Sequence, residues 1–384
     1  MRNGIPVYDS DTHALPPAEI LEPYLEPLIR ERVPDLKRYE VPMKIGFAGE
    51  VRAEPYKHLY RFADSGGWMR DEMRVLGEAE PRAGAQRKWQ QFMGGKYPTE
   101  GGLWDGDIRV KDMDEEGIDT QLMVPQGYEH PDPEVQMALL RAEHRFLDDF
   151  SSSYPRRLKS LIMVSPLDVE GSVKEIERWA GKPWAVGVRT ILPLDFPVDH
   201  PDLNPVWQAV DEANLCVVHH SFSTGYPGYR DLWRNPFLGR LSSHPWGAMR
   251  FIAAFLGAGI MDRHQNLRLA ILESGFGWLP FWARRMDEQA VYVGTVAENL
   301  QHKPSEYMTG GRFFSSFLLH EGPDMVEMVN RLLGDQILMF GSDYPHSESH
   351  FPNTVDEVSE WDVLAGDTLR KFFWENQVAA FGEP

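Results

Sequence analysis

The chain has 384 residues, of which 42% are hydrophobic and 25% are charged, the balance of a globular protein with a sizeable core. Its 58 acidic and 39 basic residues give a net charge of −19, which argues against nucleic acid or an anionic membrane as the main partner. The single cysteine, Cys216, excludes a disulfide framework and a cysteine-rich metal site. Because residues 1–6 lack the apolar stretch of a signal peptide and no apolar run could span a bilayer, we expect a cytoplasmic protein.

Short apolar runs followed by amphipathic stretches recur along the chain. The runs predict buried strands at residues 5–11, 119–124, 158–164, 186–192, 215–218, 267–272, 312–317 and 336–340. Helical patterns between them cover residues 134–151, 169–180, 204–213, 246–262, 280–289 and 323–333. Eight strands alternating with helices predict an α/β fold, a (β/α)₈ TIM barrel with insertions, although an open doubly wound sheet shows similar alternation.

Two segments break this alternation. Residues 44–107 are rich in Gly, Arg, Trp and Met without a clear period, so we interpret them as an insertion after the first strand. That loop leaves the C-terminal face of a barrel, and we expect it to cover the active site as a lid within one domain of residues 1–384. A second irregular stretch, residues 221–245, follows the fifth strand and is expected on the same face.

Polar residues gather where four of the predicted strands end. The first strand ends in Asp11 and His13, the fifth in His219 and His220, the sixth in Glu273, and the eighth in Asp343. Parallel strands bring their C-terminal ends to one mouth, where barrel enzymes collect their functional groups. We therefore expect these side chains to meet in space.

The first-strand pair is spaced like two ligands of one ion. Asp11 and His13 are two residues apart, so both side chains point to the same face of an extended strand. With a fifth-strand histidine and Asp343 they form a mixed nitrogen and oxygen set that suits Zn²⁺, with Mn²⁺ or Fe²⁺ as alternatives. Taken singly, Asp-x-His is most often a hydrogen-bonded pair and Asp343 most often begins a turn. The set as a whole predicts one divalent metal ion, because ionisable groups are rarely buried without partners.

These residues, with the motifs at 273–280 and 341–346, resemble the amidohydrolase-2 family. This is the branch of the metal-dependent amidohydrolase superfamily that includes aminocarboxymuconate semialdehyde decarboxylase. The resemblance covers nearly the whole chain except residues 44–107. It implies a (β/α)₈ barrel with one metal at its mouth, a small-molecule substrate and a homo-oligomer.

Carried over by position, the resemblance implies that Asp11, His13, His220 and Asp343 bind the metal. The first-strand pair is often His-x-His in the family and begins with an acid here. Two adjacent histidines compete for the fifth-strand position, and the family's Leu-Pro-Val pattern favours His220. Strand alternation then turns His219 to the other face, as a packing residue or a substrate contact.

Two departures from the family pattern bear on the reaction. The fourth strand carries Arg189 and no lysine, so the carboxylated lysine of two-metal members is missing. The sixth strand ends in Glu273, where the similar decarboxylases carry a histidine, which argues against decarboxylation by their route. Glu273 can bind the metal, orient water or shuttle a proton, or it can pair structurally with Arg284 or Arg285.

Four further residues are candidates for catalysis or substrate binding. His346, three residues after Asp343, can act as acid, base or substrate contact, or bond within its own loop. His244 lies before a predicted helix and contacts substrate or anchors a loop. Arg189 binds a substrate carboxylate or forms a core salt bridge, and Trp278 lines an aromatic pocket or fills the core.

Three functions are compatible with this pattern. The first is a metal-dependent hydrolase of a small carboxylate-bearing or aromatic substrate, in which the ion lowers the pKa of water to about 7 and Asp343 with Glu273 moves the proton. The second is a metal-dependent non-oxidative decarboxylase, a carboxy-lyase of an aromatic or unsaturated acid. The third, a barrel that only binds, is disfavoured by the retained ligand set. The sequence ranks hydrolysis first.

Overall fold

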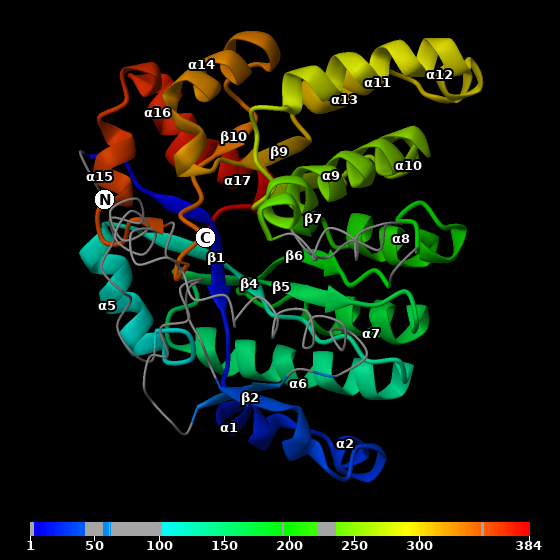
Figure 1. The fold of residues 1–384 in the computed structure, drawn as a ribbon, viewed down its shortest axis with the longest axis vertical. Helices are drawn as coiled ribbons and strands as arrows, with labels where there is room; N and C mark the ends of the chain where they lie inside the picture. The colour runs from blue at the N-terminus through cyan, green and yellow to red at the C-terminus, as the bar shows by residue number, and fades with distance from the viewer. Residues whose placement is uncertain are drawn as a thin grey trace.

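A computed structural model describes residues 4–42, 57–60, 62, 102–193, 196–220, 236–346 and 349–384. Eight parallel strands form a nearly closed barrel with helices around it (Figure 1). The strands are β1 (Tyr8–Ala14), β4 (Thr120–Pro125), β5 (Leu158–Val164), β6 (Ala185–Thr190), β7 (Cys216–His220), β8 (Arg268–Leu272), β9 (Phe313–Ser316) and β10 (Leu338–Met339). They lie side by side in chain order, which confirms the TIM barrel and excludes a doubly wound sheet, whose strand order reverses.

Hydrogen bonds between the first and last strands bring the ends of the sheet together. The amide of Ser10 donates to the carbonyl of Phe340 at 2.9 Å, and the amide of Asp343 donates to the carbonyl of Asp11 at 2.8 Å. The amide of His13 donates to the carbonyl of Tyr344, the residue after Asp343, also at 2.8 Å. The segment that carries Asp343 is thereby paired with the strand that carries Asp11 and His13.

Helices lie between successive strands and cover the outside of the barrel (Figure 1). Those that follow strands are α6 (Pro133–Ser152), α7 (Val169–Trp179), α8 (Asn204–Glu212), α9 (Pro236–Gly257), α10 (Ile260–Arg263), α11 (Leu279–Val293), α12 (Thr295–Asn299), α13 (Pro304–Thr309) and α14 (Gly322–Leu333). The remaining helices are α1 (Ala18–Leu21), α2 (Pro27–Arg32), α5 (Gly106–Glu116), α15 (Thr354–Ser359), α16 (Asp367–Arg370) and α17 (Asn376–Phe381). In the described part of the chain, none of these helices combines the length and apolarity that crossing a bilayer requires.

Helix α9 corrects the prediction for residues 221–245. The helix begins at Pro236 and runs through Pro245, so its first ten residues are helical where we expected irregular chain. The predicted helix began at Trp246, directly after Pro245, whereas the helix in the structure includes that proline. His244 consequently lies on a helix and not in a loop. Residues 221–235 lie outside the described part of the chain.

Most of the predicted insertion at 44–107 lies outside the described residues, so its role as a lid stays a prediction. Within it, β3 (His58–Tyr60) pairs antiparallel with β2 (Glu40–Pro42). At its end the Asp105 carboxylate accepts hydrogen bonds from the amides of residues 107 and 108 and caps helix α5, so the insertion ends at that cap.

The barrel interior is filled by apolar side chains below its mouth. These are Tyr8, Leu122, Val124, Leu161, Cys216, Val218, Ala270, Leu272, Phe314 and Met339. Cys216 and Val218 point inward from β7, so His220 continues the same face up to the mouth. His219 points outward, where its ring centroid lies 4.7 Å from that of Phe251 on α9. These apolar side chains fill the barrel below the polar residues at its mouth.

Candidate metal centre

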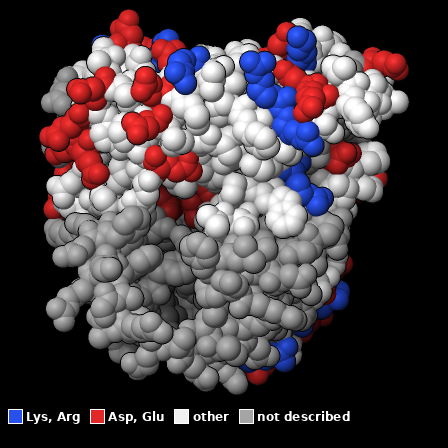
Figure 2. Space-filling view, turned by 45° about the horizontal axis from the view of Figure 1, so that its top comes forward, with Lys and Arg blue, Asp and Glu red and all other residues white. Residues whose placement is uncertain are grey.

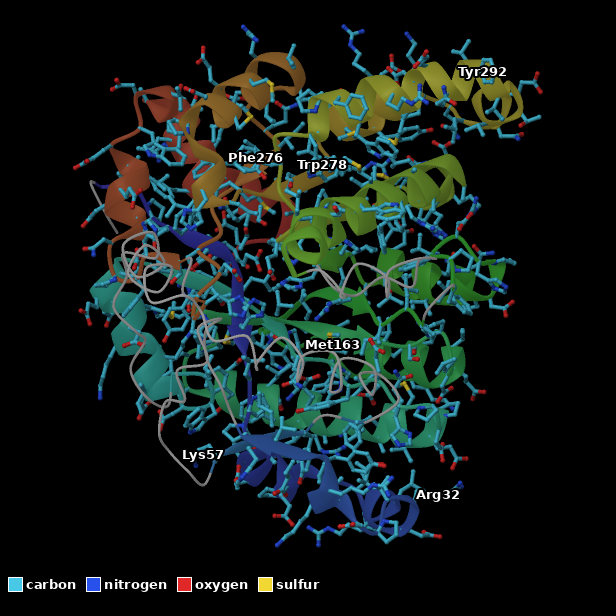
Figure 3. All side chains as sticks on the ribbon, viewed as in Figure 1. Arg32, Lys57, Met163, Phe276, Trp278 and Tyr292 are labelled. Atoms are coloured by element: carbon cyan, nitrogen blue, oxygen red, sulfur yellow. The ribbon has the colours of Figure 1, made fainter. Side chains whose placement is uncertain are left out.

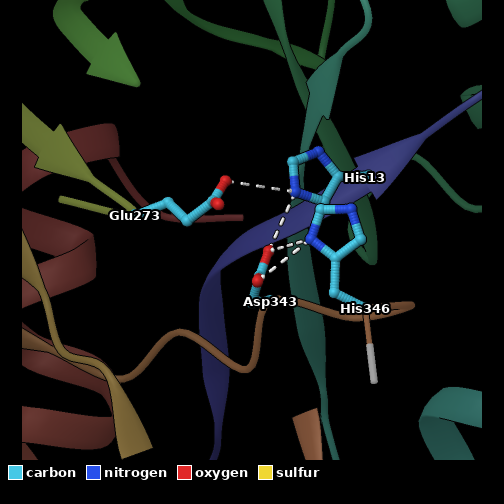
Figure 4. Close-up of side chains that lie close together, drawn as sticks. All are labelled: His13, Glu273, Asp343 and His346. Atoms are coloured by element: carbon cyan, nitrogen blue, oxygen red, sulfur yellow. Dashed lines mark hydrogen bonds and ion pairs between the residues drawn. The ribbon is translucent and has the colours of Figure 1, made fainter. Parts of the chain in front are cut away.

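Side chains from four strand ends meet at the mouth of the barrel. Ligand atoms of Asp11, His13 and His220 all lie within 4.8 Å of one another. A second group, His13, Glu273, Asp343 and His346, meets the same limit and shares His13 with the first (Figure 4). All four residues predicted as metal ligands therefore belong to one cluster, as do the predicted catalytic residues Glu273 and His346.

The β1 and β7 side of the cluster leaves a carboxylate oxygen without a hydrogen bond. His220 Nε2 lies 3.6 Å from Asp11 Oδ1, and the His13 and His220 rings are 5.1 Å apart, edge to face. Asp11 Oδ2 accepts a hydrogen bond from Ser316 Oγ at 3.2 Å. Asp11 Oδ1, fully buried, accepts none from the described residues. An oxygen in that state is available to a cation.

Glu273 and Asp343 complete the other side. His13 Nε2 lies 2.9 Å from Asp343 Oδ1 and 3.8 Å from Glu273 Oε2 (Figure 4). Asp343 also lies close to His346, whose Nδ1 is 2.9 and 3.0 Å from the two carboxylate oxygens. Glu273 Oε2 is 3.0 Å from His220 Nε2 and so links both sides of the cluster.

The backbone turns sharply at both of these carboxylate residues. Glu273 has φ +45° and Asp343 has φ +60°, in the left-handed region that side-chain-bearing residues rarely adopt. The Glu273 amide donates to Ser316 Oγ at 3.0 Å and the Asp343 amide to the Asp11 carbonyl, so the surrounding structure holds both turns. Gly341 permits this closeness, since a Cβ there would lie 2.8 Å from Asp11 Cβ. Strain held in this way is typical of functional sites.

The electrostatics are those of a buried cation site. Burial raises the pKa of Asp11. Burial lowers the pKa of His220, but the negative charges of Glu273 and Asp11 outweigh it and raise the value to about 9. Burial also works to raise the pKa of Glu273, yet His220 holds it well below its usual value. Burial and the Glu273 charge oppose ionisation of Asp343, and His346 overcomes them to lower its pKa.

The donor set fits a divalent metal ion. Three buried carboxylates and three imidazoles form two overlapping groups that share His13, and without a cation the carboxylates repel one another. Mixed carboxylate and imidazole ligands suit Zn²⁺, Mn²⁺ and Fe²⁺ alike. The structure therefore has a metal-binding site, and the identity of the ion belongs to the proposal below.

A buried arginine that the sequence analysis did not single out fastens the two ligand-bearing segments together. Arg109 on α5 is fully buried and donates to the His13 carbonyl at 2.9 Å and to Thr12 Oγ1 at 2.7 Å. It also donates to Gln121 Oε1 at 2.6 Å, and its guanidinium lies 4.3 Å from the ring centroid of Tyr344. Arg109 thus contacts β1 at Thr12 and His13, and it contacts Tyr344, the residue that follows Asp343. Arg109 lies outside every helix and strand predicted from sequence, so nothing in the sequence indicated this role.

Ser316 was also missed, although a signal for it exists. It is the last residue of β9 and contacts both Asp11 and the backbone of Glu273. The rule that gathers polar residues at strand ends applies to this strand as it does to its neighbours. Serine is uncharged, so this strand end stood out less than those that carry ionisable side chains.

The remaining predicted site residues differ in their distance from the cluster. His244 Nδ1 lies 3.9 Å from Glu273 Oε1, so helix α9 brings a histidine to the site. The Trp278 indole donates to the Ser274 carbonyl at 2.9 Å, which fixes the loop after β8 (Figure 3). Among the described residues Glu273 has no ion pair with an arginine, and Arg285 pairs with Glu288 at 3.0 Å instead.

Arg189 does not form the core salt bridge that was the alternative for it. Its side chain is 8% exposed, and no carboxylate oxygen of a described residue lies within 4.0 Å. Its Nη1 donates to the Pro125 carbonyl at 2.9 Å, while its Nε has no acceptor in the described part of the chain.

We predict that the two adjacent histidines respond differently to the same substitution. His220→Asn removes a predicted ligand and should weaken metal affinity by roughly 100-fold or more, because asparagine offers no imidazole nitrogen. His219→Asn, the matched control, should retain about one equivalent of metal because this side chain packs against Phe251. Metal analysis of the purified variants measures both. Loss of the metal from the His219 variant alone would reverse the assignment.

Comparisons with known proteins agree with this geometry. The amidohydrolase family model matches residues 11–382. An amidohydrolase from Mycobacterium avium subsp. paratuberculosis has a similar structure, with TM-score 0.73 and 19% identity over 99% of this chain and 100% of that one. The 5-carboxyvanillate decarboxylase from Sphingomonas paucimobilis is similar with TM-score 0.67 and 16% identity, over 99% of this chain and 100% of that one. A manganese complex of 5-carboxyvanillate decarboxylase from Novosphingobium aromaticivorans is similar with TM-score 0.67 and 18% identity, over 99% of this chain and 97% of that one.

No curated protein matches the chain. Identities this low to solved structures show a shared fold, whereas the family match spans almost every residue, including all the predicted ligands. The chain therefore belongs to the amidohydrolase family, as its strand-end motifs predicted, and is an enzyme of that superfamily.

Proposed function

We propose that this enzyme is a metal-dependent non-oxidative decarboxylase of a small aromatic acid. The observation that carries the proposal is the buried cluster of carboxylate and imidazole groups at the mouth of the barrel. Two similar structures are 5-carboxyvanillate decarboxylases, and one of them is a manganese complex. These neighbours favour decarboxylation over hydrolysis, the reverse of the ranking from sequence.

The metal would be held by Asp11, His13, His220 and Asp343, whose donor atoms belong to the cluster. When bound, a divalent ion supplies positive charge that holds a substrate carboxylate in place. We propose Zn²⁺ or Mn²⁺ as that ion. The sequence favours Zn²⁺, and the manganese complex of a similar structure supports Mn²⁺.

Decarboxylation leaves an electron pair on the ring carbon, which then needs a proton. The carbon–carbon bond breaks, carbon dioxide departs, and one proton adds to the carbon where the carboxylate was. Glu273 replaces the histidine expected at the end of this strand, yet His244 lies 3.9 Å from its Oε1. We assign proton delivery to this Glu273–His244 pair. The histidine missing from the strand is thus supplied by helix α9.

His346 and Asp343 connect the cluster with the surface. The His346 side chain is 35% exposed, whereas that of Asp343 is 4% exposed. With its Nδ1 against the Asp343 carboxylate, His346 can exchange a proton between solvent and the buried acid. This contact gives the buried cluster a route for proton exchange with solvent.

Hydrolysis is the second candidate, and Glu273 is the observation that favours it. Because its pKa lies well below the usual value, Glu273 is ionised and so is in the base form that attack by water requires, and it contacts His220 at the centre. The amidohydrolase from Mycobacterium avium subsp. paratuberculosis is also similar in fold.

Acidic and basic side chains are unevenly distributed over one face of the molecule. Figure 2 shows Asp and Glu gathered at its upper left and a band of Lys and Arg at its upper right, with further acidic residues beside that band. The homo-oligomer expected from the resemblance also remains a proposal, supported by exposed Phe281, Val291 and Tyr292 along α11 (Figure 3).

Carbon dioxide release separates the two reactions. We expect the protein loaded with Mn²⁺ or Zn²⁺ to release labelled carbon dioxide from one or more hydroxybenzoates carrying ¹³C in the carboxylate, and metal-stripped protein to release none. A parallel panel of esters, lactones and amides tests hydrolysis. Turnover of that panel without gas release from any aromatic acid would replace the decarboxylase with the hydrolase.

A further inference from the structure

A second pair of histidines lies on the segments that follow the last two strands of the barrel. His320 lies in the short 3₁₀ helix Leu319–Glu321 after β9, and His350 follows β10. Their ring centroids are 5.1 Å apart, and the ring planes are inclined by 64°. Both segments leave the C-terminal ends of strands, so this pair belongs to the same end of the barrel as the metal cluster.

The separation of the two rings suits a shared metal ion. Two imidazole nitrogens that bind one ion at about 2.1 Å, at a tetrahedral angle, place their ring centroids about 5 Å apart. His320 and His350 have this separation, and so do His13 and His220 of the metal centre, also at 5.1 Å. Imidazole is a ligand for Zn²⁺, Ni²⁺ and Cu²⁺, whereas Mg²⁺ prefers oxygen. The geometry therefore fits a transition-metal ion between the two rings.

A carboxylate orients one of these rings. His350 Nδ1 lies 2.8 Å from Glu357 Oε2 on α15. Such a carboxylate fixes the tautomer of a ligating histidine, directs coordination to Nε2 and makes that nitrogen a stronger donor. The backbone of His350 is also in the left-handed region, with φ +49°, and its carbonyl accepts from the Asn353 amide at 2.9 Å. A ring contact alone requires neither the carboxylate nor the strained backbone.

The two histidines lie on segments that also hold carboxylates of the metal cluster. Glu321, the residue after His320, accepts a hydrogen bond from the Gly277 amide at 2.6 Å and so holds the loop that begins at Glu273. The second histidine lies further along the segment that carries Asp343. An ion shared by the two rings would therefore join the surroundings of two strand ends that form the cluster.

We propose that His320 and His350 form a second site for a transition-metal ion such as Zn²⁺, with Glu357 as the carboxylate that orients His350. The site is separate from the metal centre and does not depend on which reaction the enzyme catalyses. It offers two protein ligands, with water in the remaining positions, whereas four predicted ligands surround the centre. The second ion should therefore bind more weakly than the first.

Zinc titration of the loaded protein tests this site. Protein that already carries one equivalent of Zn²⁺ receives more Zn²⁺ in a calorimeter, and a second, weaker equivalent should bind. His320→Asn and His350→Asn should each weaken that second equivalent at least tenfold and keep the first. Asparagine is chosen because it tolerates the left-handed backbone of His350. Glu357→Gln should weaken the second equivalent roughly tenfold, as loss of an orienting carboxylate does at other metal sites.

Three controls separate this site from general attraction of cations to an acidic chain. Mg²⁺ in place of Zn²⁺ should show no second equivalent that depends on the two histidines. His302→Asn removes another exposed histidine, and Glu360→Gln another exposed acid at the end of α15, and both should keep the second equivalent.

Three results would overturn the proposal. The first is absence of a second equivalent, and the second is equal binding of it by the parent, His320→Asn and His350→Asn, which would leave a ring contact only. The third is loss of the first equivalent together with the second, which would make these histidines part of the main centre. Circular dichroism reports folding, and if His350→Asn does not fold, the exposed His320→Asn variant decides.

Discussion

Replacing Asp343 with asparagine should lower kcat/KM by about 10³-fold or more while the protein stays folded. Asp343 Oδ1 lies 2.9 Å from His13 Nε2 and 2.9 Å from His346 Nδ1. Asparagine keeps the shape but loses the charge that attracts a cation and holds the two histidines. Metal affinity should fall together with activity, and metal analysis and steady-state rates on the same samples measure both.

A conservative change elsewhere controls for this substitution. Asp324→Asn alters an exposed acid in the first turn of α14 and should leave activity and metal content unchanged. Circular dichroism reports whether each variant folds. A folded Asp343→Asn enzyme with full activity would show that this carboxylate takes no part in the reaction, and both proposed mechanisms would fail with it.

Replacing Arg109 with methionine should lower the free energy of unfolding by about 3 kcal/mol or more. The substitution fills similar space but leaves Thr12 Oγ1, the His13 carbonyl and Gln121 Oε1 buried without their donor. It also removes the guanidinium from the ring of Tyr344. Urea unfolding measures the loss of stability, and calorimetric titration measures the accompanying loss of metal affinity.

Two further variants separate positioning from general destabilisation. Arg109→Lys keeps the charge but loses the planar guanidinium that makes several hydrogen bonds. Its free energy of unfolding and its metal affinity should therefore lie between those of the parent and the methionine variant. Arg157→Met removes another partly buried arginine, one that bonds the carbonyls of Asp119 and Ile118, and should cost stability without weakening metal binding. Equal loss of metal affinity in the Arg109 and Arg157 variants would mean that Arg109 has no specific influence on the centre.

The barrel was predictable because each buried parallel strand can be recognised from its local sequence. Each is a short apolar run between amphipathic stretches, and all eight runs became strands of one sheet. The cluster was predictable for a related reason, since parallel strands carry their ends to one mouth. Alternation along β7 likewise separated His220, which faces Asp11 and Glu273, from His219, which faces Phe251.

What could not be predicted depends on contacts between distant parts of the chain. Nothing near His244 in sequence indicates that α9 brings it 3.9 Å from Glu273, and the helix itself begins ten residues earlier than expected. Arg109 has no local signature either, because its role consists of bonds to residues that are remote in sequence. Hydrolysis was ranked over decarboxylation because Glu273 stands where similar decarboxylases carry a histidine. The sequence did not indicate that His244 on α9 lies beside Glu273.

The pairing of the 341–344 segment with β1 affects when the centre can form during biosynthesis. Asp11 and His13 leave the ribosome early, but their partner Asp343 is made only near the end of the chain. At the usual rates of translation that interval lasts tens of seconds. A nascent chain would therefore hold an incomplete set of the predicted ligands for most of its synthesis, and metal loading would follow closure of the barrel.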